Sequence, residues 1–243
     1  MANLTMKSAL TVAAIFVSAG RTAQAQSLTV LPVSIQMSNG QLATSLTVIN
    51  GGSSETSIQI RGFVWTQAGG KDQLTASDDI LASPPLATIA PGSIQTVRLV
   101  VRKPPMGKEV TYRVVLDQIP PPVLPGTVQV ALRLSIPVFV QPSTRTAAHV
   151  SFQVERGGGR AYLVAINSGS AHETFRDIAL TMQDGKAVTI GADASPYILA
   201  DSSSRWPIVS PAPLPAPHGV LHLTAQALER VIDRQVPVVD VQP

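Results

Sequence analysis

The sequence has no cysteine among its 243 residues, few aromatic residues (4%) and few charged residues (14%). Without cysteine there can be no disulfide scaffold, no thiolate metal site and no cysteine nucleophile. So few aromatic side chains make a stacking platform for single-stranded nucleic acid an unfavourable hypothesis. Apolar residues make up 44% of the chain, which is too many for a disordered protein. The 20 prolines and 17 glycines argue against a helical bundle, because both residues break helices.

The first 25 residues have the three parts of a secretory signal peptide. Lys7 supplies the positive start, residues 9–19 form the apolar centre, and Ala23-Gln24-Ala25 is a small-x-small cleavage site. Removal of Lys7 and Arg21 with this segment leaves 16 basic residues against 15 acidic ones, so bulk charge does not favour nucleic acid as a partner. The apolar centre of about 11 residues is too short to span a bilayer. We therefore expect an exported protein without membrane insertion.

After this segment the dominant hydrophobic period is two residues, which is typical of half-buried β-strands. Turn pairs such as Asn39-Gly40 and Pro91-Gly92 separate the alternating segments. No segment with helical periodicity exceeds two turns, so the pattern predicts an all-β protein built from sandwiches. The clearest alternating segments of the N-terminal half are residues 33–37, 46–49, 58–61, 97–101 and 112–116.

The longest alternating run carries Val128, Val130, Leu132, Leu134 and Ile136 on one face. It continues to residue 140 and is followed by the polar segment 141–146, which is typical of a linker. The strand pattern then restarts at residue 150. The length of the chain fits two domains, so we predict a signal peptide at 1–25 and β-sandwich domains at 26–142 and 143–243.

Several short motifs follow one another in order over about 115 residues of the first half of the chain. They are Val48-Ile49-Asn50, Ile80-Leu81-Ala82-Ser83-Pro84-Pro85, Ile89-Ala90-Pro91-Gly92, Thr96-Val97-Arg98-Leu99, Glu109-Val110-Thr111-Tyr112-Arg113-Val114, Gln118-Ile119-Pro120-Pro121 and Val128-Gln129-Val130-Ala131-Leu132, followed by Phe139 and Pro142. Together these motifs resemble those of the periplasmic pilus-assembly chaperones of the chaperone–usher family. The second half of the chain matches this family more loosely, through Asn167-Ser168-Gly169 with His172 and through Tyr197-Ile198-Leu199.

The resemblance implies a boomerang of two immunoglobulin-like domains that works in the periplasm without ATP or cofactor. Such a chaperone captures pilus subunits that lack their last strand, lends them a strand of its own and delivers them to an outer-membrane usher. The resemblance places the lent strand at Val128, Val130, Leu132 and Leu134. An added strand completes the backbone ladder of its partner while alternate side chains fill pockets. The competing interpretation is that these side chains pack the core of their own domain.

The resemblance also implies a basic clamp for the terminal carboxylate of the subunit, and here this sequence departs from the family. The two usual basic positions correspond to Ser34 and Pro137. A carboxylate buried at this place still needs charged or hydrogen-bonded partners. We expect Arg113 to be the substitute, with Arg133 and Arg98 as weaker candidates. The alternative for each arginine is a solvated position on the face of a sheet.

A second departure concerns the ion pair that joins the two domains in this family. Glu109 matches the acidic partner, but Gln141 stands where the arginine is expected, so this pair must be absent or rebuilt. We expect His172 to be a turn or surface residue. Trp65 and Trp206 are expected to be anchors in a core or at the domain interface, because each buries a large apolar area.

The remaining patterns favour neither an enzyme nor a metal site. His218 and His222 have i, i+4 spacing, but they lie in a loop and strand context and lack a third ligand nearby. Asp78-Asp79 is expected to be a solvated pair, and no Gly-x-Ser-x-Gly motif is present. A pilus structural subunit or two-domain adhesin is the alternative to a chaperone, and a secreted β-sandwich hydrolase or sugar-binding module is a third class. A long apolar edge needs cover in the resting protein, so a self-capping homodimer is a further hypothesis.

Overall fold

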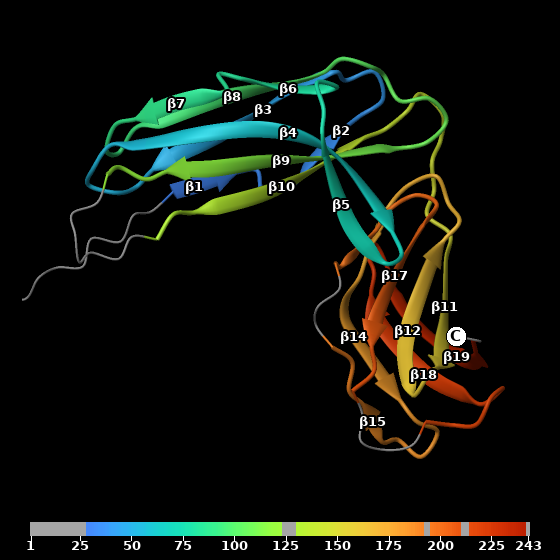
Figure 1. Ribbon diagram of the computed structural model, residues 1–243. Coiled ribbons are helices and arrows are strands. Elements are labelled where there is room, and N and C mark those ends of the chain that lie inside the picture. Colours follow the sequence, from blue (N-terminus) through green and yellow to red (C-terminus); the bar gives the residue numbers. More distant parts are fainter. Residues whose placement is uncertain (1–27, 123–129, 192–194, 210–213, 242–243) are drawn as a thin grey trace, which may run out of the picture.

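The computed structural model describes residues 28–122, 130–191, 195–209 and 214–241, and every helix or strand assigned to them is a β-strand. The strands form two lobes that meet at an angle, and Figure 1 shows the bent shape that results. The first lobe contains β1 to β10 and the second contains β11 to β19. These features confirm the predicted all-β class and its boomerang arrangement. Within the described residues no helix is long and apolar enough to cross a membrane.

The first lobe is a sandwich of two sheets. One sheet has the strand order β1-β3-β8-β6, and the other has the order β2-β10-β9-β4-β5, with β7 added beside β4. The bounds of these strands are β1 Leu28–Leu31, β2 Ile35–Met37, β3 Ala43–Asn50, β4 Thr56–Ala68, β5 Lys71–Ala76, β6 Ile80–Ser83, β7 Leu86–Ile89, β8 Ile94–Val101, β9 Val110–Ile119 and β10 Arg133–Val140.

The core of the first lobe lies between these two sheets. Val48 and Val97 from one sheet and Leu116 and Val138 from the other are completely buried in it. Each such side chain contributes about 1.5–3 kcal/mol when it is removed from water. The core therefore holds β10 firmly at its C-terminal half, while the N-terminal end of that strand lies beyond it.

The chain changes sheets between β1 and β2, and this differs from the strand predicted over residues 33–37. β1 pairs with β3 in one sheet, whereas β2 runs parallel to β10 in the other. Ile35 and Met37 are buried as their alternation predicts, but Val33 is 75% exposed because it lies in the crossing segment. This crossing leaves Ser34 at the junction of the two lobes.

The second lobe is dominated by a seven-stranded sheet with the order β15-β14-β18-β19-β11-β12-β17, accompanied by the small pair β13-β16. The first hairpin of the lobe turns at Gly158 and Gly159, whose φ angles of +58° and +73° favour glycine. The bounds are β11 Val150–Gly157, β12 Arg160–Asn167, β13 Glu173–Thr174, β14 Arg176–Thr181, β15 Ala187–Val188, β16 Tyr197–Ile198, β17 Ser202–Pro207, β18 Val220–Gln226 and β19 Val231–Asp240.

Aromatic and aliphatic side chains from both lobes pack together where the lobes meet. Trp65 of β4 and Phe139 of β10 form one cluster with Leu199 and Tyr197 of the second lobe. The Trp65 and Tyr197 rings meet edge to face at 5.3 Å, and the Gln67 side chain bonds the backbone of Tyr197 at 2.8 Å and of Leu199 at 2.9 Å. Trp65 is therefore an interface anchor. Trp206, 4% exposed in the second core, is a core anchor, so both tryptophan predictions are confirmed.

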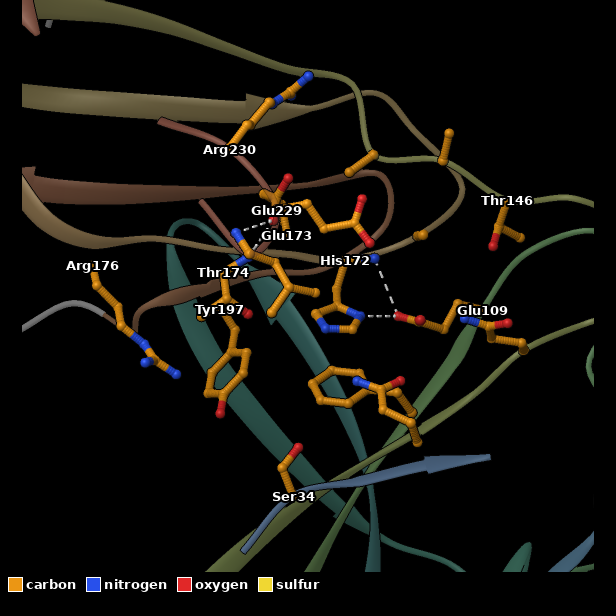
Figure 2. Close-up of a pocket in the computed structure, with 17 residues that line it drawn as sticks. Ser34, Glu109, Thr146, His172, Glu173, Thr174, Arg176, Tyr197, Glu229 and Arg230 are labelled. Atoms are coloured by element: carbon orange, nitrogen blue, oxygen red, sulfur yellow. Dashed lines mark hydrogen bonds and ion pairs between the residues drawn. The ribbon is translucent and has the colours of Figure 1, made fainter. Parts of the chain in front are cut away.

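A buried pair between Glu109 and His172 reinforces this joint. His172 Nδ1 lies 2.7 Å from Glu109 Oε1, its backbone N–H donates to the same oxygen at 3.1 Å, and its ring stacks on Phe139 with a centroid distance of 3.5 Å. Figure 2 shows both bonds. The two side chains are only 7% and 1% exposed. The expectation that His172 is a turn or surface residue is wrong, because its side chain is buried between Glu109 and the ring of Phe139. The expected interdomain pair is thus rebuilt with another residue.

We predict that His172→Phe weakens the joint while His172→Ala weakens it further. Phenylalanine keeps the stack on Phe139 but leaves the buried Glu109 carboxylate without its ring partner, which costs about 1–3 kcal/mol. Alanine loses the stack as well. Denaturant unfolding and the distribution of distances between spin labels on the two lobes measure both effects. His222→Ala, at an exposed histidine, is the matched control, and equal behaviour of His172→Ala and this control would contradict the prediction.

Candidate functional site

Strand β10 has one paired edge and one open edge. β9 pairs with it along its whole length, from Arg133 to Val140. On the other side β2 pairs only with residues 138–140. No strand in the described part of the chain covers that side between Arg133 and Pro137. Such an edge presents unpaired backbone groups that another strand can bind.

The hydrogen bonds to β9 alternate along β10, and this alternation shows which residues direct their backbone groups to the open edge. The N–H of Gln118 donates to the Leu132 carbonyl at 2.8 Å, so the even-numbered residues of β10 bond β9 and the odd-numbered ones face outward. Arg133 and Ser135 therefore direct both backbone groups to the open edge. Pro137 lies in the same phase, where its missing N–H costs β10 no bond to β9.

The aliphatic row predicted for the lent strand passes from the core into solvent. Leu134 is half-buried against the first core. Leu132 is 37% exposed and Val130 is 81% exposed. Val128 lies outside the described residues. The row thus projects past the core of its own lobe, and the interpretation that it only packs that core fails for Val130 and Leu132. The regular strand begins at Arg133, later than the alternation predicts.

Two contacts hold the beginning of β10 against β9. The N–H of Leu132 donates to Gln118 Oε1 at 3.2 Å. Arg133 bonds Asp117 directly, and Arg61 lies 2.6 Å from the other oxygen of the same carboxylate. The hydrogen bond from Arg133, helped by Arg61, lowers the pKa of Asp117. Arg133 is therefore engaged with its own sheet, which weakens it as a candidate for a subunit carboxylate.

Arg113 lies close to the joint, between the two lobes. Its guanidinium carbon is 3.7 Å from the centroid of the Trp65 ring and 5.3 Å from that of Tyr197. The side chain is 13% exposed, and Asp72 is 3.7 Å away. Burial lowers the pKa of Arg113, whereas electrostatic interactions with Asp72 and Tyr197 act in the opposite direction and raise it. Since 3.7 Å is too long for a hydrogen bond, Arg113 is ion-paired with Asp72 but its guanidinium donates no hydrogen bond within the described part of the chain.

Arg98 is not brought to the same place. It lies on β8, in the other sheet of the first lobe, where it faces Ser45 and Ser83 in the neighbouring strands and is exposed. The structure therefore separates the three arginines that sequence reasoning grouped together. Only Arg113 is both near the junction of the lobes and without a hydrogen-bonded partner.

A cleft of about 710 Å³ opens between the lobes on the side of Ser34. Figure 2 shows its walls, with Ser34 on the first lobe and Arg176 and Tyr197 on the second. Sequence reasoning missed Arg176, because a single arginine in a short irregular strand carries no pattern. Tyr197 belongs to a loosely matching motif, which gave no prediction that it lines a cleft, because its place in the wall depends on the angle between the lobes.

The described residues bring together no group of three His, Cys, Asp or Glu side chains that could hold a metal ion. The polar side chains that line the cleft can form hydrogen bonds and ion pairs.

Comparisons with known proteins agree with this geometry. A chain in the CsuC–CsuE complex of chaperone and tip adhesion subunit, from the archaic chaperone–usher Csu pili of Acinetobacter baumannii, has a TM-score of 0.65 and 20% identity. The match covers 88% of this chain and 99% of that one. The YadV chaperone gives a TM-score of 0.61 at 17% identity over 86% of this chain and 98% of its own. The E. coli chaperone DraB gives 0.59 at 18% identity over 87% and 97%.

These structural matches establish a fold shared along the length of both lobes. No curated protein sequence shows significant similarity to this one. The family model described as the pili and flagellar-assembly chaperone, PapD N-terminal domain, matches residues 27–145. This segment includes β1 to β10 and therefore the whole open edge. Over these N-terminal residues, the chain matches the family of pili and flagellar-assembly chaperones.

Proposed function

We propose that this protein is a periplasmic chaperone that binds pilus subunits by lending them the segment around β10 and then passes them to an outer-membrane usher. The observation that carries the proposal is the open edge of β10 next to the exposed aliphatic row of Val130 and Leu132. The proposal includes no ATP, cofactor or catalytic step. It also includes export by the signal peptide predicted at 1–25, which lies outside the described residues, and domain limits at 26–142 and 143–243.

The chemistry of the edge matches a partner that lacks one strand. Such a partner exposes an apolar groove and a row of unpaired backbone groups, both of which promote aggregation. The outward N–H and carbonyl groups of Arg133 and Ser135 can extend its ladder, while Val130 and Leu132 fill its groove. Burial of each aliphatic side chain contributes about 1.5–3 kcal/mol as an upper bound. An exposed ion pair contributes only about 0–1 kcal/mol, so the aliphatic row dominates the affinity.

We propose Arg113 as the anchor for the carboxylate that ends the subunit chain. Its guanidinium is largely removed from water, is fixed over the Trp65 ring and has Asp72 as an ion-pair partner at 3.7 Å, beyond hydrogen-bond distance. A carboxylate that reached these donors would form charge-assisted hydrogen bonds, which are stronger than neutral ones. Arg113 pairs in register with Pro137 of β10, so it lies next to the strand that we propose is lent. Arg133 and Arg98 remain lower-ranked proposals for the reasons given above.

The alternative role as a structural subunit or adhesin is less well supported. A subunit of that kind needs a free donor segment near its mature N-terminus. Here Leu28–Leu31 already pairs with β3 of its own lobe, so this segment is not free to be lent to a neighbour. A likeness to the archaic Csu system supports placing the protein in that branch of the family.

We further propose that the resting protein covers its open edge by pairing with a second copy. Val130 at 81% exposure and Leu132 at 37% exposure form an apolar strip along unpaired backbone, and such strips tend to associate. A symmetric dimer through this edge would hide the strip until a subunit replaces the second copy.

Leu132→Asp and Val130→Asp are predicted to lower subunit affinity by about 100-fold or more, because each would place a charge in an apolar groove. Co-expression with a pilus subunit from a neighbouring gene, followed by co-purification and titration, measures the loss. The control is Ile94→Asp, at a position that is 64% exposed on the other sheet. Unfolding curves confirm that each variant is folded. Full capture by folded Leu132→Asp would be incompatible with strand lending.

Arg113→Gln is predicted to weaken capture of the same subunit by about 10- to 100-fold, the effect of losing hydrogen bonds to a charged group. Arg113→Lys should retain part of the affinity, because lysine keeps the charge but not the planar fork. Arg102→Gln, at an exposed arginine of the first lobe, is the matched control, since it removes the same charge away from the joint. Unchanged capture by Arg113→Gln would eliminate this residue as the anchor.

Light scattering at increasing protein concentration is expected to show a dimer of the free protein that Leu132→Asp abolishes. The physical reason is that aspartate places charge on the apolar strip that the two copies would share. A monomer at high concentration would remove the self-capping hypothesis but would leave subunit binding intact.

A further inference from the structure

Three polar groups without partners face one corner of the cleft, and they come from both lobes. Arg176, Tyr197 and Ser34 line the cleft, and Figure 2 shows their side chains directed toward the same region. Arg176 forms no ion pair, and the hydroxyl groups of Tyr197 and Ser34 form no hydrogen bond, within the described part of the chain. A guanidinium and two hydroxyl donors are a suitable set for one anionic group.

The backbone around Arg176 is irregular in a way that aims its side chain. The pairing of β14 with β18 shifts register between Arg176 and Ala179, and Asp177 has a φ angle of +51°. Bulges of this kind redirect side chains and occur often beside functional sites. On the other side, Thr174 pairs directly with Tyr197. Arg176 is therefore two residues from the register partner of Tyr197, which keeps the two side chains on one wall.

No acidic residue that lines the cleft forms an ion pair with Arg176 within the described part of the chain. Glu109 is engaged by His172. Glu173 accepts hydrogen bonds from the backbone N–H groups of Thr174 and Leu228. Glu229 lines the cleft, but it forms no ion pair with Arg176 among the described residues. The charge of Arg176 is thus available to a ligand that enters the cleft.

We propose that Arg176, Tyr197 and Ser34 form a second carboxylate site, which binds an acidic group of the polypeptide held on β10. The proposal rests on the proposed function, because the lent strand brings that polypeptide to the cleft. It gives the second lobe a direct part in recognising the subunit. The site lies in the cleft wall and does not include Arg113, so it adds to the proposed anchor and does not replace it. It would favour subunits with an acidic residue at the matching position.

The test measures the dissociation rate of the chaperone–subunit complex for Arg176→Gln and Tyr197→Phe. We expect Arg176→Gln to accelerate dissociation on the order of tenfold at low salt and less at high salt, because the site is partly exposed to solvent. Tyr197→Phe should act in the same direction by a smaller factor. It keeps the ring that packs on Trp65, so it separates loss of the hydroxyl from loss of the joint. Arg160→Gln, at the exposed hairpin turn of the second lobe, is the control.

Double-mutant cycles identify the source of the carboxylate. Arg176→Gln is combined with Glu→Gln or Asp→Asn changes in the subunit, and separately with a subunit whose C-terminus is amidated. If the effects of Arg176→Gln and a side-chain change on the dissociation rate are not additive, the site is supported and that side chain is its ligand. If they are not additive with the amidated terminus, the site is supported and the terminus is its ligand. Additivity in every cycle, with a dissociation rate equal to that of Arg160→Gln, would overturn the site. Leu132→Asp distinguishes the two failures, because it tests the proposed function without touching the cleft.

Discussion

The structure depends on one strand, β10, whose two edges are paired to different extents. β10 is paired with β9 along one edge and is left open on much of the other. Its C-terminal half belongs to the core, where Val138 and Val140 are fully buried, whereas Val130, before the strand begins, is 81% exposed. The core therefore stabilises a rigid base from which the apolar row projects. An edge without that base would lose too much conformational entropy on binding to be an efficient donor.

The same strand also builds the joint between the lobes. Phe139 faces away from the first core, packs on Trp65 and Tyr197, and stacks on the ring of His172. It lies five positions after Leu134, so the joint and the open edge share one short segment of backbone. The angle between the lobes is thus fixed relative to the edge. This explains how two residues of different lobes, Ser34 and Tyr197, can line one cleft.

Much of the fold could be predicted from the sequence, because period-two alternation reports directly on strands with one buried face. The row at Val130 and Leu132 was predicted to be lent because the long alternating run stands among motifs that resemble those of a chaperone family, and alternation alone would also have fitted packing in the domain's own core. The joint could not be predicted in this way. His172 carries no periodic signal, and its role depends on a contact with Glu109 across 63 positions of the chain. Arg176 was missed for the same reason, since its value depends on a bulge and on the angle between the lobes.

The proline at position 137 limits how a lent strand can be used. Odd-numbered residues of β10 face the open edge, so an added strand would receive N–H donors from Arg133 and Ser135 but none from Pro137. Beyond this point β2 occupies the edge, and the N–H of Gln141 donates to the Met37 carbonyl at 3.0 Å. A ladder formed with a partner must therefore end near Ser135 and extend toward Leu132 and Val130.

The family's usual base at 137 would lie at the end of that ladder. In this protein the nearby cations are Arg113 on β9 and Arg176 on the second-lobe wall of the cleft, and the backbone of β10 restricts neither of them.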